Sequence, residues 1–139
     1  MRTERRLSES EARLIPLRML AHLGDAVFHL HEREREILTS VSARQLHDKA
    51  TSRVKAVKQA ELLDLIENKL TETEADIVRR ARNLKPAGYR KVGQSAYRKA
   101  TAFEALVGFL YLCDPVRLDE IFACLNPGTQ AEPAAGANP

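Results

Sequence analysis

The sequence predicts an all-α fold, and three observations lead to that prediction. Apolar residues recur at helical spacing along most of the chain, and no stretch alternates apolar and polar residues as a half-buried strand does. Residue pairs such as Thr71 with Glu74 and Asp114 with Pro115 mark helix starts. A chain of 139 residues, 44% hydrophobic and 29% charged, also fits one globular domain with a core.

The chain divides by composition into three parts. Residues 1–14 are polar and charged, and we expect a frayed turn or a short helix there. Residues 15–125 carry the helical patterns and form the expected domain. Residues 126–139 are rich in Pro, Gly and Ala, so we expect a disordered tail.

The first long helix is expected to run from Pro16 to about Leu38, since the missing N–H of proline costs nothing in a first turn. Its last part alternates charges from Glu32 to Glu36. We expect this part to be a solvated helix end held by ion pairs one turn apart.

Further helices follow in order. Ser42 is the expected N-cap of a helical stretch that continues to about residue 69, with a kink near residues 51–52. Thr71 and Glu74 form a predicted capping box, and that helix stops at residues 85–88. After a basic loop, Ser95 is expected to cap a second long helix, and Asp114 with Pro115 opens a last helix to about residue 125.

The cysteines and the longest apolar run indicate the cellular compartment of the protein. Cys113 and Cys124 are too few for a disulfide framework, so we expect reduced core thiols. The N-terminal residues lead into no apolar signal core, and the longest apolar run, residues 105–113, is far shorter than the roughly 20 residues of a membrane helix. We therefore expect a cytoplasmic protein.

Positive charge is concentrated in one segment. The net charge is only +3, but residues 79–99 hold eight basic residues and no acidic one. The rest of the chain holds fourteen basic and nineteen acidic residues, a net charge of −5. This asymmetry favours a polyanionic partner, and a merely solvated basic face is the alternative.

Two apolar helices each carry one carboxylate near a glycine. Asp25 follows Gly24 in the first long helix, and Glu104 precedes Gly108 by one turn in the second. If the helices cross at the glycines, the carboxylates face each other and repel unless a proton or a cation lies between them. With oxygen ligands alone, a hard cation such as Mg²⁺ or Mn²⁺ is the natural occupant, and its chemistry includes phosphodiester hydrolysis.

Other interpretations of these residues stay open. Asp25 could simply pair with a neighbouring helix. His22, Asp25 and His29 share one helical face, which is also compatible with a transition-metal site, although histidines that line a cleft are the simpler interpretation. His47 suggests a structural hydrogen bond, and Tyr97 a core anchor.

The two carboxylate helices carry motifs of a known family. Leu-x-x-Leu-Gly-Asp-Ala-Val at 20–27 and Ala-Phe-Glu-Ala-Leu-Val-Gly-x-Leu-Tyr-Leu at 102–112 resemble the ribonuclease III catalytic domain. Leu-His-x-x-Ala-Thr at 46–51, Arg-Arg-Ala-Arg-Asn at 79–83 and Tyr-Arg-x-x-Thr-Ala-Phe-Glu at 97–104 are similar to the Mini-ribonuclease III branch, which lacks a double-stranded-RNA-binding domain. The resemblance spans about residues 17–125.

The resemblance implies a ribonuclease III-type helical endonuclease domain that works as a symmetric homodimer with one valley for double-stranded RNA. It implies Mg²⁺-dependent cleavage to 5′-phosphate and 3′-hydroxyl ends, and maturation of precursors of large-subunit (23S) ribosomal RNA. Asp25 and Glu104 match the catalytic, metal-binding carboxylates of the family. The implied RNA contacts are Arg82, Asn83, Lys85, Arg90, Lys91 and Arg98.

The chain departs from full-length ribonuclease III at three positions of the site. Arg18 and Ala21 stand where that family has acidic residues, and Thr101 stands where it has an aspartate. Fewer charged oxygens predict weaker metal binding with more coordinating water. A non-catalytic dimer that binds double-stranded RNA is therefore the main alternative, and a helical DNA-binding module is a second one.

Overall fold

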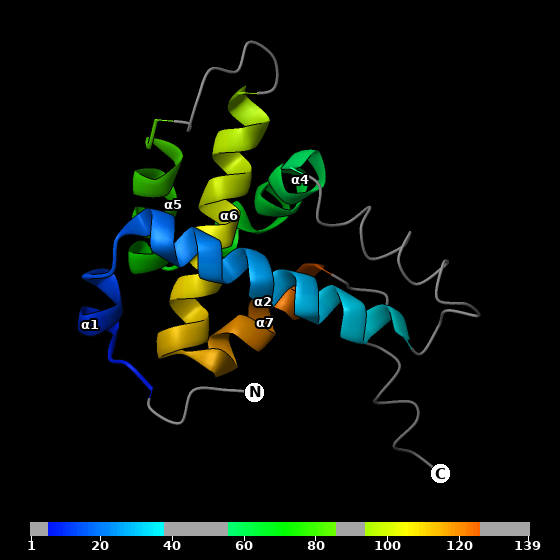
Figure 1. Cartoon of the computed structure of the whole chain (residues 1–139), viewed down its shortest axis with the longest axis horizontal. Helices are drawn as coiled ribbons and strands as arrows, with labels where there is room; N and C mark the ends of the chain where they lie inside the picture. The colour runs from blue at the N-terminus through cyan, green and yellow to red at the C-terminus, as the bar shows by residue number, and fades with distance from the viewer. Residues whose placement is uncertain (1–5, 38–55, 86–93, 126–139) are drawn as a thin grey trace.

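A computed structural model describes residues 6–37, 56–85 and 94–125 of the chain. All the regular elements in these ranges are helices, so the all-α prediction is confirmed (Figure 1). The elements are α1 (Glu9–Arg13), α2 (Leu17–Ile37), α4 (Ala56–Ile66), the short 3₁₀ helix η1 (Glu67–Lys69), α5 (Glu72–Arg82), α6 (Gln94–Cys113) and α7 (Pro115–Leu125). None of the described helices is long and apolar enough to cross a membrane.

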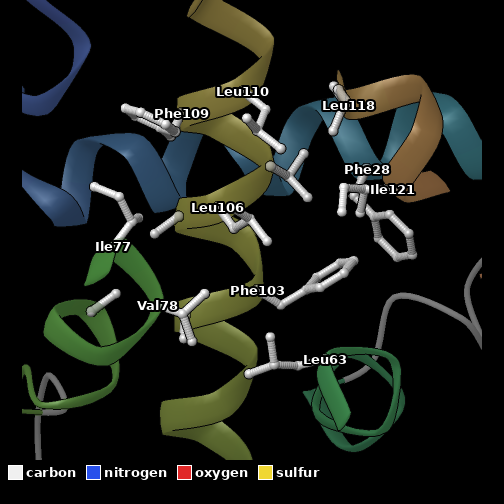
Figure 2. Packing of buried hydrophobic residues seen from close by; sticks show 14 of the residues in the cluster. Phe28, Leu63, Ile77, Val78, Phe103, Leu106, Phe109, Leu110, Leu118 and Ile121 are labelled. Atoms are coloured by element: carbon white, nitrogen blue, oxygen red, sulfur yellow. The ribbon is translucent and has the colours of Figure 1, made fainter. Parts of the chain in front are cut away.

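Helix α6 is the centre of the domain. Helices α2, α4 and α5 all pack on it, and Figure 1 shows α2 crossing it at a steep angle. The mutual packing explains why α6 is apolar on most of its surface: nine of its residues are buried. Figure 2 shows Phe103, Leu106 and Leu110 of α6 pointing towards side chains of the surrounding helices, with the Phe28 and Phe103 rings edge to face at 5.1 Å.

Helices α2 and α6 touch backbone to backbone at Gly24 and Gly108. A Cβ atom on Gly24 would lie 1.7 Å from the carbonyl oxygen of Glu104, and one on Gly108 would lie 2.0 Å from the carbonyl oxygen of Leu20. No side chain fits at either position, because the opposing atoms belong to the main chain. The predicted crossing of the two helices at their glycines is confirmed.

Several helix boundaries follow from local hydrogen bonds. The predicted capping box of α5 is present, with Thr71 as N-cap and Glu74 bonding back to its N–H. A second capping box, not predicted, joins Ser8 and Glu11 and starts α1. The Asp114 side chain accepts from the N–H of Arg117 at 3.1 Å, as expected for the start of α7. Ser95 lies inside α6, which begins at Gln94, so its predicted place as the cap is wrong.

The charged end of α2 is not the solvated segment that the sequence predicts. Glu32 is fully buried, and Arg35 and Glu36 are partly buried and paired at 2.7 Å. Glu32 follows Leu20, Gly24 and Phe28 at intervals of four residues, so it continues the buried face of the helix. Only Arg33 and Glu34 of this run are exposed.

Helices α5 and α7 are joined by a buried ion pair. Arg117 donates from Nε to one oxygen of Glu74 at 2.8 Å and from Nη2 to the other at 2.9 Å. Its Nη2 also donates to the carbonyl oxygen of Lys69 at 2.9 Å. Burial works to raise the pKa of Glu74, but the hydrogen bonds and the charge of Arg117, with those of Thr71, hold it below its ordinary value.

The remaining predictions about the fold concern the two cysteines and several residues that lie outside the described ranges. Cys113 and Cys124 are free and half-buried, and burial, followed by the charge of Asp114, raises the pKa of the Cys113 thiol to about 11. The expected Ser42 cap, the kink at 51–52, His47 and the tail at 126–139 lie outside the described residues.

Candidate active site

Asp25 and Glu104 come together where α2 crosses α6. Both line a pocket of about 240 Å³, whose other walls are Arg18, Ala21, His22, Tyr97 and Thr101. The backbone contact at Gly24 and Gly108 fixes this arrangement, since Asp25 is next to one glycine and Glu104 is one turn from the other. The sequence therefore predicted correctly that the two carboxylates face each other.

The pKa of Glu104 lies well above the ordinary value of a glutamate. Burial, a hydrogen bond to Asp25 and the negative charge of Asp25 together raise the pKa of Glu104 to about 8. Such a pair is unfavourable with both members ionised and becomes favourable when a cation replaces the proton. The site is thus poised to bind positive charge.

A hard divalent cation fits the donors that are present. Within residues 6–37, 56–85 and 94–125, no group of three or more His, Cys, Asp or Glu side chains forms a metal cluster. A transition-metal site at His22, Asp25 and His29 therefore has no support from the geometry. Two carboxylates in a pocket open to water suit an ion that keeps several waters, such as Mg²⁺.

Asp25 lies at the end of a chain of polar contacts along α2. His29 Nε2 lies 3.2 Å from Asp25 Oδ1, and Arg33 Nη1 lies 3.1 Å from His29 Nδ1. Arginine can only donate, so Nδ1 accepts, and Nε2 is the ring nitrogen that carries the proton beside Asp25. One oxygen of Asp25 is thereby held while the side chain stays half-exposed.

Two residues of the pocket are committed to backbone partners. The Thr101 hydroxyl donates to the carbonyl oxygen of Tyr97 at 3.0 Å, one turn earlier in α6. The Arg18 guanidinium donates to the carbonyl oxygen of Lys85, which ties the start of α2 to the end of the segment after α5. Tyr97, which the sequence analysis interpreted as a core anchor, is only half-buried and lines the pocket.

Gln59 is the residue of this region that the sequence analysis missed. It lies on α4, is only 2% exposed, and its amide approaches Glu104. Its Nε2 nevertheless has no partner within hydrogen-bond limits among the described residues. A buried donor left unpaired costs about 1–3 kcal/mol. A polar residue between Val57 and Ala60, in an apolar helical pattern, was the available signal.

The described residues among the predicted RNA contacts lie at the end of α5 and in the first turns of α6. Arg82 at the end of α5 is paired with Glu67 at 3.2 Å, and Asn83 is the exposed C-cap of that helix. Both line a second hollow of about 310 Å³. Lys85 is exposed, whereas Arg98 is half-buried on α6. Arg90 and Lys91 lie outside the described residues.

Comparison with known proteins gives a consistent result. Residues 18–115 match the family model described as the ribonuclease III domain. A Mini-ribonuclease 3 of Synechococcus sp. is 40% identical over 87% of this chain and 88% of its own, and one of Thermoanaerobacter sp. is 44% identical over 79% and 78%. A crystal structure of a Fusobacterium nucleatum protein superposes with a TM-score of 0.75 and 28% identity, over 83% of this chain and 96% of the other.

Proposed function

We propose a site and a substrate from one premise: the chain belongs to the ribonuclease III family, among the Mini-ribonuclease 3 proteins, and is an endoribonuclease. Its substrate is double-stranded RNA, as the family domain implies. The finer proposal is cleavage in the pocket between α2 and α6, with Mg²⁺ as the divalent cation and Mn²⁺ as a substitute. The observation that carries it is the pair of facing carboxylates, Asp25 and Glu104, in one pocket.

Asp25 and Glu104 act as the catalytic, metal-holding residues in this proposal. A bound divalent cation would supply a polarised phosphate oxygen and a more acidic water as nucleophile, which would give 5′-phosphate and 3′-hydroxyl products. The two side chains would hold that cation, and they would do so best above the raised pKa of Glu104. The contact with His29 restricts rotation of the Asp25 carboxylate. The Gly24–Gly108 contact keeps the two carboxylates at a constant separation.

A homodimer is part of the proposal and is supported by an apolar stripe on α2. Met19, Leu30 and Ile37 are more than half exposed, and they are spaced by eleven and seven residues. That spacing places them on one side of the helix, opposite to the buried face. An exposed apolar stripe is typical of a protein interface, and two copies joined here would bring their pockets towards one RNA.

The basic segment is proposed to hold the RNA backbone. Lys85 is exposed, and its carbonyl oxygen is bonded to Arg18 of the pocket wall, so a phosphate near this lysine lies close to the carboxylates. The other proposed contacts are Arg82, Asn83, Arg90, Lys91 and Arg98. Maturation of 23S ribosomal RNA precursors in the cytoplasm is the biological role that we propose.

The test is cleavage of labelled double-stranded RNA by the full chain with Mg²⁺, with EDTA, and by the variants Asp25→Asn and Glu104→Gln. Each substitution should lower the cleavage rate about 1,000-fold or more, equivalent to roughly 4 kcal/mol, while RNA binding changes little. Glu61→Gln is the matched control, because that carboxylate is exposed on α4, pairs with Lys58 and does not line the pocket.

Two outcomes would contradict the proposal. Wild-type rates in either variant would remove the carboxylates from the reaction. Binding of RNA without cleavage under all metal conditions would instead favour the non-catalytic RNA-binding alternative. Duplex DNA of the same sequence tests the DNA-binding alternative, since a preference for RNA indicates recognition of A-form shape and 2′-hydroxyls.

Joint neutralisation of Lys85, Arg90 and Lys91 tests the proposed grip on RNA. The logarithm of the binding constant should fall less steeply with the logarithm of salt concentration, by up to about one unit for each lost phosphate contact. An unchanged slope would mean that these residues do not touch the RNA backbone.

A further inference from the structure

The amide of Gln59 is a buried polar group that the proposed reaction leaves unexplained. Gln59 comes from α4, a third helix beside the crossing of α2 and α6, and only 2% of the residue is exposed. Its neighbours along α4, Ala60, Leu62 and Leu63, are buried and apolar. Nothing in the packing of a helix on its neighbours requires an amide at this position, because an apolar side chain of the same size would fill the same space.

The Gln59 amide approaches Glu104 and works to lower the pKa of that carboxyl, against the larger opposing effects of burial and Asp25. Nε2 nevertheless forms no hydrogen bond within ordinary limits to the residues described.

We propose that Gln59 is a positioning residue, whose buried N–H donates to the ionised Glu104 carboxylate and holds it in the orientation that receives a divalent cation. An N–H bonded to an ionised carboxylate is stronger than one bonded to a neutral group. A Glu104 carboxylate turned towards α4 would supply the acceptor that the buried Nε2 lacks among the described residues. One oxygen of Glu104 is then held from α4, and the other remains for the cation.

This arrangement would place matching supports on both carboxylates. His29 holds one oxygen of Asp25 from the same helix at 3.2 Å, and Gln59 would hold one oxygen of Glu104 from a different helix. Groups that orient metal-binding side chains in this way typically account for 10- to 100-fold in metal affinity. The inference rests on the proposed function, because it assumes that Glu104 binds the cation.

The test measures Mg²⁺ and Mn²⁺ binding to the full chain without RNA, by isothermal titration calorimetry and by the rise in Tm on adding metal. Gln59→Met removes the donor and keeps the volume, and it should weaken metal binding at least 10-fold. Cleavage should fall at low metal concentration and recover towards the wild-type rate when metal is saturating. Leu63→Met is the matched control, since it changes buried packing on the same helix without a polar group.

The outcomes separate the two proposals. If Glu104→Gln loses metal binding while Gln59→Met binds as tightly as the wild type, the role of Gln59 is refuted and the site stands. If Glu104→Gln binds metal as the wild type does, the proposed site itself fails. A Gln59→Met variant that only lowers Tm, as Leu63→Met can, would show a packing role and overturn the inference. Should Gln59→Met not fold, Gln59→Asn, with its amide one methylene shorter, takes its place and should also weaken metal binding.

Discussion

Glu74 and Glu104 lie in opposite electrostatic environments. Glu74 at the start of α5 receives both donors of one face of Arg117, and its pKa lies below the ordinary value. Glu104 in the middle of α6 faces Asp25, and its pKa is raised to about 8. The difference shows that the fold provides a cation where a carboxylate holds two helices together, and withholds one where a carboxylate lines a pocket.

The largest effect should come from changing Gly24, because its contact with α6 supports the Asp25–Glu104 pocket and not the Glu74–Arg117 pair. Gly24→Ala would place a Cβ atom 1.7 Å from the Glu104 carbonyl oxygen, so α2 and α6 must separate. We expect a loss of about 3 kcal/mol in the free energy of unfolding, together with loss of cleavage. Urea unfolding and a cleavage assay measure both, with Ala26→Ser on the exposed side of α2 as a control. Normal activity in Gly24→Ala would show that the separation of the carboxylates is not critical.

Glu74→Gln should lower the free energy of unfolding without abolishing cleavage. Arg117 would lose its bidentate partner, and breaking a buried pair costs about 3–5 kcal/mol. We expect about 2–3 kcal/mol, because a quarter of the arginine side chain (24%) stays exposed. Glu61→Gln, which breaks an exposed pair with Lys58, should change stability by less than about 1 kcal/mol. Comparable losses from both variants would mean that the Glu74 pair is no more than a surface contact.

His29→Ala should have a smaller effect, confined to the carboxylate site. It removes the imidazole whose Nε2 lies 3.2 Å from Asp25, and we expect kcat/KM to fall about 10-fold, near 1.4 kcal/mol, with little change in stability. His29→Gln, which keeps an N–H donor, should restore part of the loss. Measuring kcat/KM at several metal concentrations checks this, and equal rates for the Ala and Gln variants would argue against an orienting hydrogen bond.

The last comparison is a pair of opposite pH slopes. Between 4.5 and about 8, the folded metal-free protein keeps on Glu104 a proton that the unfolded chain has released, so stability falls as pH rises through this window. Glu74 contributes stability that is present above 4.5 and lost as pH falls through its lowered pKa. Urea unfolding from pH 3 to 9 in EDTA measures both slopes. Glu104→Gln should flatten the upper slope alone.

Local patterns predicted the features that depend on a few adjacent residues. The helical class, the capping box of Thr71 and Glu74 and the start of α7 at Pro115 all follow from neighbours in the sequence. The glycine crossing was also predictable, because a glycine beside a carboxylate in each of two apolar helices is costly and recurs.

Contacts between distant residues were not predictable in the same way. Glu74 was correctly placed in a capping box, but its pairing with Arg117, 43 residues later, has no local signal. Arg82 was expected to meet phosphate, and its ion pair with Glu67 appears only when α5 packs near η1. Glu32 could have been placed in the interior from its spacing after Phe28, but its charge and its charged neighbours favoured a solvated end.

The contact between Gly24 and Gly108 also has a consequence for hydrogen exchange. The backbone amides at this crossing are covered by the opposing helix, so solvent reaches them only when α2 leaves α6. Their protection from exchange should therefore equal the global free energy of unfolding, whereas amides of the five-residue helix α1 should exchange through local opening. The two glycine resonances would thus report, in a single spectrum, whether the scaffold beneath the carboxylates is intact.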